Sequence, residues 1–315
     1  MKDRTRTVGG RNSPDQIPAK PNAAVRRNQM KKIQLHAYAK INLTLDVTGR
    51  RPDGYHDVEM IMQQISLCDE VTVSWEAGSV RRGKPGQTAE PDPTGIQIQL
   101  TVSRSDLPAD SSNLAWKAAA EMIAEFGGPA GGSSKAAAGT EAAGGNAKAA
   151  AGTEAAGGVL TIHIQKQIPM AAGLAGGSSN CAAVLHAINQ LWELNLSVKE
   201  LCRIGARLGS DVPFCIMGQA AAEKALQGSF ADDPDACHCA LATGTGTDLK
   251  PLTGLDSFIV LSKPAIGVST AEVYRGIDNE GIPRHPDNNA VISAICENNY
   301  KVLEEKWSMY LKILR

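Results

Sequence analysis

The fold is decided by residues 169–180, PMAAGLAGGSSN, which place three glycines and two serines within twelve residues. Glycine lets the backbone approach a ligand closely and adopt positive φ, so that successive N–H groups converge on phosphate oxygens. We expect a helix to begin at Ser178 and Ser179, where free N–H groups and the positive end of the helix dipole favour an anion. The stretch therefore predicts a phosphate-binding loop, and the alternative is a flexible Gly-rich surface loop.

The sequence on either side predicts a strand before this loop and a helix after it. Before the loop, Leu160, Ile162 and Ile164 alternate with polar residues, as in a strand with one buried face. After it, apolar residues recur at helical spacing at Val184, Leu185, Ile188, Leu191 and Trp192. The loop is neither a Walker A motif nor a dinucleotide fingerprint, because no lysine follows its glycines and their spacing is not GxGxxG.

Composition and charge exclude several classes of protein. The chain has 315 residues and a formal net charge of −1, enough for one large or two ordinary domains. The charge gives no sign of nucleic-acid or membrane binding, and no apolar run approaches the ~20 residues that cross a bilayer. Seven scattered cysteines do not resemble a disulfide framework, which favours a cytoplasmic location. The spacing of Cys237, His238 and Cys239 suits a structural zinc site badly.

Two segments are expected to lie outside the folded core. Residues 1–30 are basic, contain several Pro and Gly, and hold few large apolar residues, which predicts a disordered extension that is not a secretory signal. Residues 127–158 contain KAAAGTEAAGG twice, at 135–145 and 148–158, and no large apolar side chain. Such a segment cannot offset the entropy of ordering, so we expect a mobile low-complexity insertion.

The remaining patterns predict mixed strands and helices. In a strand expected from Gln34 onward, one face carries Ile41, Leu43, Leu45 and Val47, and the other carries Lys40, Asn42, Thr44 and Asp46. Further strands are expected over 58–73, 94–102 and 258–261, and helices over 113–126, 201–208, from 270 and after 289. Ser197 to Glu200 form a capping-box pattern, and residues 223–239 are interpreted as a second insertion.

Three segments together resemble the GHMP-type small-molecule kinases. They are residues 37–57, which contain AKINL and RRPDGYH, residues 169–180, and residues 209–214, GSDVPF. The Gly-rich loop is shared across that superfamily. The pair AKINL and RRPDGYH is more selective and is similar to the 4-diphosphocytidyl-2-C-methyl-D-erythritol kinases, a resemblance that spans roughly residues 31–303.

The resemblance implies an α/β (α+β) fold of two domains. The first is a ribosomal-protein-S5-like domain over residues 31–222, and the second is a ferredoxin-like domain over residues 223–315. A third glycine-rich motif near Gly-Ser-Gly-Pro, expected in the second domain, is missing from the sequence, so we expect that domain to be truncated.

The activity implied is ATP-dependent phosphorylation of the 2-hydroxyl of 4-diphosphocytidyl-2-C-methyl-D-erythritol, a step of non-mevalonate isoprenoid synthesis. The partner is then a small-molecule substrate, without nucleic acid or membrane. The alternatives are another GHMP kinase, such as homoserine kinase, and an inactive nucleotide-binding remnant. The oligomeric state does not follow from the sequence.

The resemblance also implies roles for single residues. Asp211 is the expected base and Lys40 its close partner, which polarises the hydroxyl, while Asn42 orients the pair or the substrate. Taken alone, Lys40 is better explained as a solvated strand lysine, and Asp211 is explained as a loop or N-cap aspartate. Phosphoryl transfer needs alignment and charge neutralisation, which the joint occurrence of these residues would supply.

The resemblance further implies which residues contact the cytosine of the substrate, Mg²⁺ and ATP. Tyr55 and His56 are expected beside the cytosine with Tyr274 opposite, since planar rings suit stacking on a pyrimidine; Tyr274 alone is equally a residue at the core margin. Mg²⁺ is expected to bridge the ATP phosphates, with Ser179 a candidate ligand and no dedicated metal motif. ATP is expected on Pro169, Met170, Ala171, Ala172, Gly173, Leu174, Ala175, Gly176, Gly177, Ser178 and Ser179.

Overall fold

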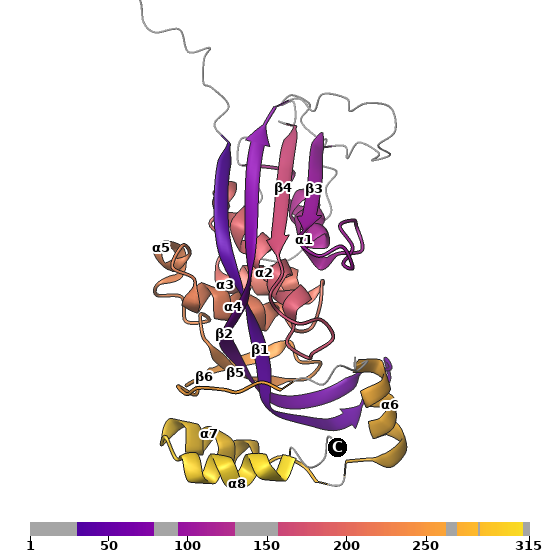
Figure 1. Ribbon diagram of the computed structural model, residues 1–315, viewed down its shortest axis with the longest axis vertical. Helices are drawn as coiled ribbons and strands as arrows, with labels where there is room; N and C mark the ends of the chain where they lie inside the picture. The colour runs from indigo at the N-terminus through magenta and orange to yellow at the C-terminus, as the bar shows by residue number, and fades with distance from the viewer. Residues whose placement is uncertain (1–29, 79–93, 130–156, 263–269, 283, 311–315) are drawn as a thin grey trace, which may run out of the picture.

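The computed structural model describes residues 30–78, 94–129, 157–262, 270–282 and 284–310 (Figure 1). The expected N-terminal extension and nearly all of the expected insertion at 127–158 lie outside these ranges. Every helix among the described residues is too short or too polar to cross a lipid bilayer. The described chain forms one mixed sheet, helices that pack on it, and a group of C-terminal helices at one end (Figure 1).

The sheet contains six strands in the order β3-β4-β2-β5-β6, with β1 also paired to β2. Strands β3 and β4 are parallel, as a helical connection between them requires, and the other pairs are antiparallel. The strands expected from Gln34, over 58–73, over 94–102 and before the loop are confirmed. Their bounds are β1 (Lys31–Arg50), β2 (His56–Ala77), β3 (Ile96–Val102), β4 (Gly158–Gln165), β5 (Cys239–Thr243) and β6 (Asp248–Leu252).

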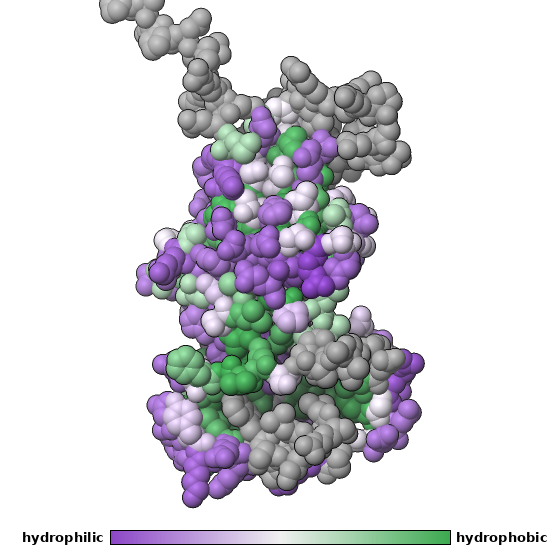
Figure 2. All heavy atoms as spheres, in the orientation of Figure 1, coloured by the Kyte–Doolittle hydropathy of each residue, from purple (hydrophilic) through white to green (hydrophobic). Residues whose placement is uncertain are grey.

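Strand β1 departs from the simple alternation that its sequence predicts. Its pairing with β2 shifts register three times, between Tyr38 and Lys40, between Asn42 and Thr44, and between Val47 and Gly49. Each bulge adds a residue and turns the following side chains toward another side. As a result the expected polar face is largely buried and Leu45, from the expected apolar face, is 44% exposed. In Figure 2 apolar residues gather over the lower part of the β1–β2 ribbon.

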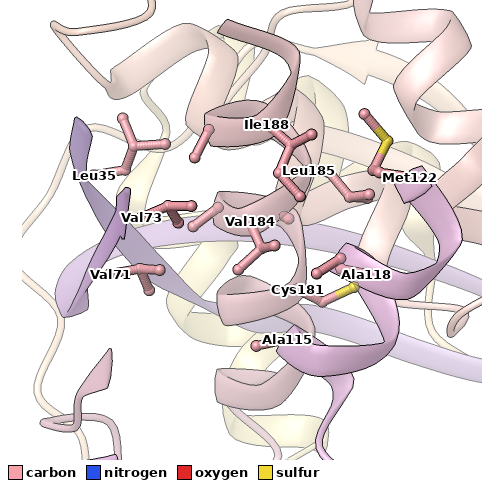
Figure 3. Packing of buried hydrophobic residues seen from close by; sticks show 14 of the residues in the cluster. Leu35, Val71, Val73, Ala115, Ala118, Met122, Cys181, Val184, Leu185 and Ile188 are labelled. Carbon is pink, nitrogen blue, oxygen red and sulfur yellow. The ribbon is translucent and has the colours of Figure 1, made fainter. Parts of the chain in front are cut away.

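Five helices complete the main core, and α2 lies at its centre. The helices expected over 113–126 and 201–208 are confirmed, with Asn113 and Ser197 as N-caps and the expected capping box formed. On the two sides of α2, its buried side chains meet Val71 and Val73 of the sheet and Ala118 of α1 (Figure 3). Each such aliphatic side chain contributes about 1.5–3 kcal/mol on burial. The bounds are α1 (Leu114–Phe126), α2 (Gly176–Leu191), α3 (Val198–Ala206), α4 (Val212–Ala222) and α5 (Gln227–Phe230).

Two expectations for the second half of the chain are wrong. Residues 223–239 are not a peripheral insertion, because Leu226 and Phe230 are buried in the main core. Residues 258–261 do not form a strand, and Phe258 and Val260 are almost fully exposed. Their alternation gave a strand pattern, but a strand also needs a hydrogen-bonded neighbour, which this segment does not find among the described residues.

The C-terminal helices pack against the lower end of the β1–β2 ribbon (Figure 1). Helix α6 (Thr270–Glu280) places Tyr274 and Ile277 against a buried cluster that includes Val58. Helices α7 (Asn288–Cys296) and α8 (Tyr300–Tyr310) share a second cluster with Leu43 and Ile61. Strands β5 and β6 join the same sheet as β1 to β4, so the boundary expected at residue 222 does not separate two sheets.

Candidate active site

A cavity of about 1680 Å³ lies where the Gly-rich loop, the turn between β1 and β2, the start of α4 and helix α6 converge. It is lined by nearly the whole loop from Pro169 to Gly177 and by Lys40, Asn42 and Asp211. Tyr55, His56 and Tyr274 line it as well. The structure therefore brings almost all of the expected site residues to one hollow; Ser178 and Ser179 are the exceptions.

The loop joins β4 to α2 and is shaped by alanines as well as by glycine. Positive φ occurs at Ala171 (47°), Gly173 (70°) and Ala175 (55°), whereas Gly176 and Gly177 are already helical. Glycine, which favours positive φ, therefore supplies it at only one of these three positions. A non-glycine residue in this region costs of order 1–2 kcal/mol, and such strain concentrates at functional sites.

Gly176 is needed for a different reason, because the side chains of Ile168 and Lys166 lie close to its backbone. A Cβ added to it would lie 3.1 Å from Ile168 Cγ2 and 3.1 Å from Lys166 Nζ. A side chain at this position would therefore require Ile168 and Lys166 to shift by a few tenths of an ångström.

The first bulge of β1 fixes the loop to the sheet. The Lys40 backbone N–H donates to the Leu174 carbonyl at 3.2 Å, and the Ser179 hydroxyl donates to the Tyr38 carbonyl at 2.6 Å. Ser179 is fully buried, and neither it nor Ser178 lines the cavity. The Ser179 hydroxyl is thus bonded to the backbone of β1 and does not line the cavity.

Lys40 and Asp211 meet at the mouth of the cavity. Lys40 Nζ lies 3.5 Å from Asp211 Oδ2 and donates to Asn42 Oδ1 at 3.0 Å. Lys40 is only 4% exposed, so it is not a solvated strand lysine. Asp211 does occupy the N-cap position of α4, but its side chain makes no capping hydrogen bond and is 30% exposed. The carboxylate is therefore held beside an ammonium and left open to the cavity.

The aromatic residues at the far end of the cavity are arranged differently from the expectation. His56 and Tyr274 stack directly on each other, with ring centroids 4.7 Å apart and an interplanar angle of 22°, while Tyr55 is 69% exposed at the rim. The sequence analysis expected a cytosine ring between His56 and Tyr274, but in the structure these two rings contact each other directly. Burial, with a smaller effect of the Asp211 charge, raises the pKa of Tyr274. The phenol is therefore neutral.

Comparison with known proteins identifies the family. A family model for the GHMP kinases N terminal domain matches residues 113–219. The chain is 38% identical over 278 residues to the 4-diphosphocytidyl-2-C-methyl-D-erythritol kinase of Alkaliphilus metalliredigens, covering 88% of this chain and 74% of that enzyme. The chain belongs to this family of GHMP kinases.

Two further relatives agree with that assignment. The enzyme of the same name from Bacillus subtilis is 37% identical over 266 residues and is covered over 70% of its length, with 84% of this chain aligned. A crystal structure of 4-(cytidine 5'-diphospho)-2C-methyl-D-erythritol kinase matches with a TM-score of 0.51 and 27% identity, over 84% of this chain and 72% of that one. The expected GHMP-kinase fold is confirmed.

Sequence reasoning missed a second charged cluster in this GHMP kinase, directly beneath the loop. The Asp69 carboxylate is fully buried and accepts from the backbone N–H groups of Gln167, at 2.6 Å, and Ile168, at 2.8 Å. It also accepts from Asn180 Nδ2 at 2.8 Å and pairs with Lys166 Nζ. This cluster ties β2, the entrance of the loop and the first turns of α2 together. The only hint in the sequence was an acidic residue inside an apolar strand.

Proposed function

We propose that this GHMP kinase transfers the γ-phosphoryl group of ATP to the 2-hydroxyl of 4-diphosphocytidyl-2-C-methyl-D-erythritol. The observation that carries the proposal is the 3.5 Å approach of Lys40 Nζ to Asp211 Oδ2 between a phosphate-type loop and an aromatic recess. In this proposal the loop holds the phosphates of ATP, which is the phosphoryl donor. The Lys40–Asp211 pair carries out the transfer, and the aromatic recess holds a pyrimidine.

The nucleotide is expected at the end of the cavity next to the loop. Part of the cavity lining is apolar and suits a flat base, while the first N–H groups of α2 lack intrahelical partners and suit phosphate oxygens. Mg²⁺ is expected to arrive on the ATP phosphates, because the described residues hold no cluster of three or more acidic, His or Cys ligands. The apolar lining residues that precede the loop in sequence include Val102, Leu107, Ile164 and Ile168.

The transfer itself is mainly a matter of position. The substrate hydroxyl would lie against Asp211, which takes its proton as the oxygen attacks the γ-phosphorus and the bond to the β-phosphate oxygen breaks. Lys40 is held by Asn42 and Asp211, and its charge offsets the negative charge that moves across the three phosphates. Both groups need little reorganisation, since Lys40 is already buried and oriented.

The cytidyl end is expected against the His56–Tyr274 stack. Tyr55, exposed at the rim, offers a second flat surface on which a pyrimidine can stack. Homoserine has no aromatic ring that could stack in this recess, which favours the cytidyl substrate over the alternative GHMP activity.

The test is a direct assay of phosphoryl transfer. The protein is incubated with ATP, Mg²⁺ and either 4-diphosphocytidyl-2-C-methyl-D-erythritol or homoserine, and the phosphorylated product is detected by ³¹P NMR. We expect product with the cytidyl substrate alone. Product with homoserine alone would overturn the substrate assignment, and ATP binding without product from either would support an inert nucleotide-binding protein.

A further inference from the structure

A second cavity, of about 620 Å³, lies between the middle of β2, the end of α4 and the segments before β5 and after β6. It shares no lining residue with the candidate active site. Small-molecule sites in proteins have volumes of roughly 300–1,000 Å³, so the space is sufficient for a small ligand. Its polar lining includes Tyr38, Gln63, Gln64, Ser66, Cys237, His238 and Asp256.

The cavity exists because β2 bulges at the point where β1 turns Lys40 inward. Two consecutive pairs in the register are Tyr38 with Cys68 and Lys40 with Gln64. Residues 65–67 of β2 therefore lie opposite a single residue of β1, and a strand with such extra residues bends out of the sheet. The bulge that accompanies Lys40 at the active site thus also opens the second cavity, which Tyr38 and Gln64 line.

Several polar side chains of this cavity have hydrogen-bonding capacity that the protein does not use. Gln63 is fully committed, because its Oε1 accepts from the Leu255 N–H at 2.9 Å and its Nε2 donates to the Gln64 carbonyl at 2.9 Å. Within the described part of the chain, four other lining residues have side chains that form neither a hydrogen bond nor an ion pair: Tyr38, Ser66, His238 and Asp256.

The charge of the cavity decides which kind of ligand it suits. Partial removal from water lowers the pKa of His238, and burial raises the pKa of Tyr38, so both groups are neutral at neutral pH. Burial likewise raises the pKa of Cys237 to about 11. No lysine or arginine of the described ranges lines the cavity, whereas Asp256 does. A phosphate or another anion finds no positive partner here, and a cation finds a carboxylate.

We propose that the second cavity is a binding site for a small organic cation, an amine with an apolar body whose ammonium group lies against Asp256. An ammonium group has three N–H donors, which match the acceptors that the protein leaves unused. The Tyr38 ring also offers a face on which a cation can lie. The apolar body would contact the apolar side chains of the lining, which are Ile65, Ala222, Ala236, Leu252 and Leu255. This site is independent of the phosphoryl transfer proposed above.

The first test compares three probes of one shape and different charge. Amide ¹H–¹⁵N spectra of the full chain are titrated with 2-phenylethylammonium, 2-phenylethanol and phenylacetate, with ADP, Mg²⁺ and CDP present to fill the active-site cavity. We expect the ammonium compound to bind about tenfold tighter than the alcohol, and phenylacetate to bind weakest. The amides that shift should lie at 63–66, 236–238 and 252–256.

The result would be overturned by equal affinities for the three probes, or by shifts that fall on other residues. The map of shifted amides separates the two cavities even where the nucleotides do not bind. A failure of the phosphoryl-transfer assay is therefore distinct from a failure of this inference.

The second test removes the charge. Asp256 is exposed, so Asp256→Asn should fold normally, lose most of the preference for the ammonium compound and bind the alcohol within about twofold of the wild type. Glu76→Gln removes another exposed carboxylate, opposite Val159 and away from the cavity, and is the matched control that should keep the preference. An unchanged preference in Asp256→Asn would show that the carboxylate does not hold the cation and would refute the assignment.

Discussion

Two lysine–aspartate pairs border the same cavity and are built in opposite ways. In the pair beneath the loop, the Lys166 and Asp69 side chains are 6% and 0% exposed, and Asp69 accepts four hydrogen bonds. In the pair at the mouth, Lys40 is equally enclosed at 5% but Asp211 is 30% exposed and lies 3.5 Å from the ammonium. The residue types are the same, but the two aspartates differ in exposure and in the number of their partners.

That difference separates a structural carboxylate from one available to a ligand. A buried carboxylate is tolerated when donors occupy its oxygens, and removing a partner is then strongly destabilising. Asp69 meets that condition and has no acceptor capacity facing the cavity. Asp211, without a capping bond, keeps an oxygen for a substrate hydroxyl. Mutations at the two sites should therefore act on different properties of the protein.

The largest expected effect is on turnover, in Asp211→Asn. The amide keeps the shape but cannot take up the proton, so we expect kcat to fall by about 10³-fold. ATP affinity should stay within about twofold, and the loss in free energy of unfolding should be smaller than that of Asp69→Ala, because Lys40 keeps its hydrogen bond to Asn42 and the amide oxygen of the new side chain can still accept. Steady-state kinetics, nucleotide titration and urea unfolding measure the three quantities. Equal losses of turnover and ATP binding would contradict the division drawn between the two pairs.

The next effect is on stability, in Asp69→Ala. Removal of the carboxylate leaves the Lys166 ammonium and two backbone N–H groups without their acceptor, and we expect a loss of about 3–5 kcal/mol in urea unfolding. Asp106→Ala, which breaks an exposed pair with Arg104, is the matched control and should leave the unfolding midpoint unchanged. An unfolding midpoint for Asp69→Ala equal to that of the wild type would show that the buried pair is not structural.

A double variant sharpens the same point. Adding Lys166→Met to Asp69→Ala removes the uncompensated charge, so part of the lost stability should return. The recovery should be incomplete, because the N–H groups of Gln167 and Ile168 still lack their acceptor. No recovery would mean that the cost lies in those backbone bonds and not in the charge.

The sequence predicted the pair at the mouth and missed the pair beneath the loop for a physical reason. Lys40 and Asp211 each lie in a short segment whose residue types together resemble a known kinase. Asp69 and Lys166 are 97 residues apart, and only the pairing of β2 with β4 brings them together. Nothing local in either segment requires the contact, so composition and periodicity carry no sign of it.

Details of the predicted site failed where tertiary structure overrides local pattern. The strand and the helix around residues 169–180 were predicted because each has its own periodicity, and the loop was predicted from its glycines and serines. The bulges of β1, which bury Lys40 and direct its backbone N–H to Leu174, depend on pairing with β2. The positive φ at Ala171 and Ala175 is imposed by the surroundings on residues that do not favour it.

A histidine also connects the two helices that lie next to these pairs, α2 and α4. His186 lies on α2, which supplies Asn180 to the buried pair, and its Nε2 donates to the Ile216 carbonyl of α4, which carries Asp211, at 3.0 Å. Its Nδ1 has no partner among the described residues. Burial, opposed in part by that hydrogen bond, lowers the pKa of His186 to about 4.

The smallest expected effect is therefore the pH dependence that His186 adds. Its ordinary pKa is 6.5, so below that pH the unfolded chain binds a proton that the folded chain does not bind until about pH 4. The free energy of unfolding should be full above pH 6.5 and fall as the pH drops to 4, by at most about 3 kcal/mol from this group. His186→Gln can still donate to Ile216 but does not titrate, so its urea midpoint should fall less steeply across that range. Identical slopes for the two proteins would mean that acid weakens the helix contact through other groups, and that the link between α2 and α4 does not depend on a neutral imidazole.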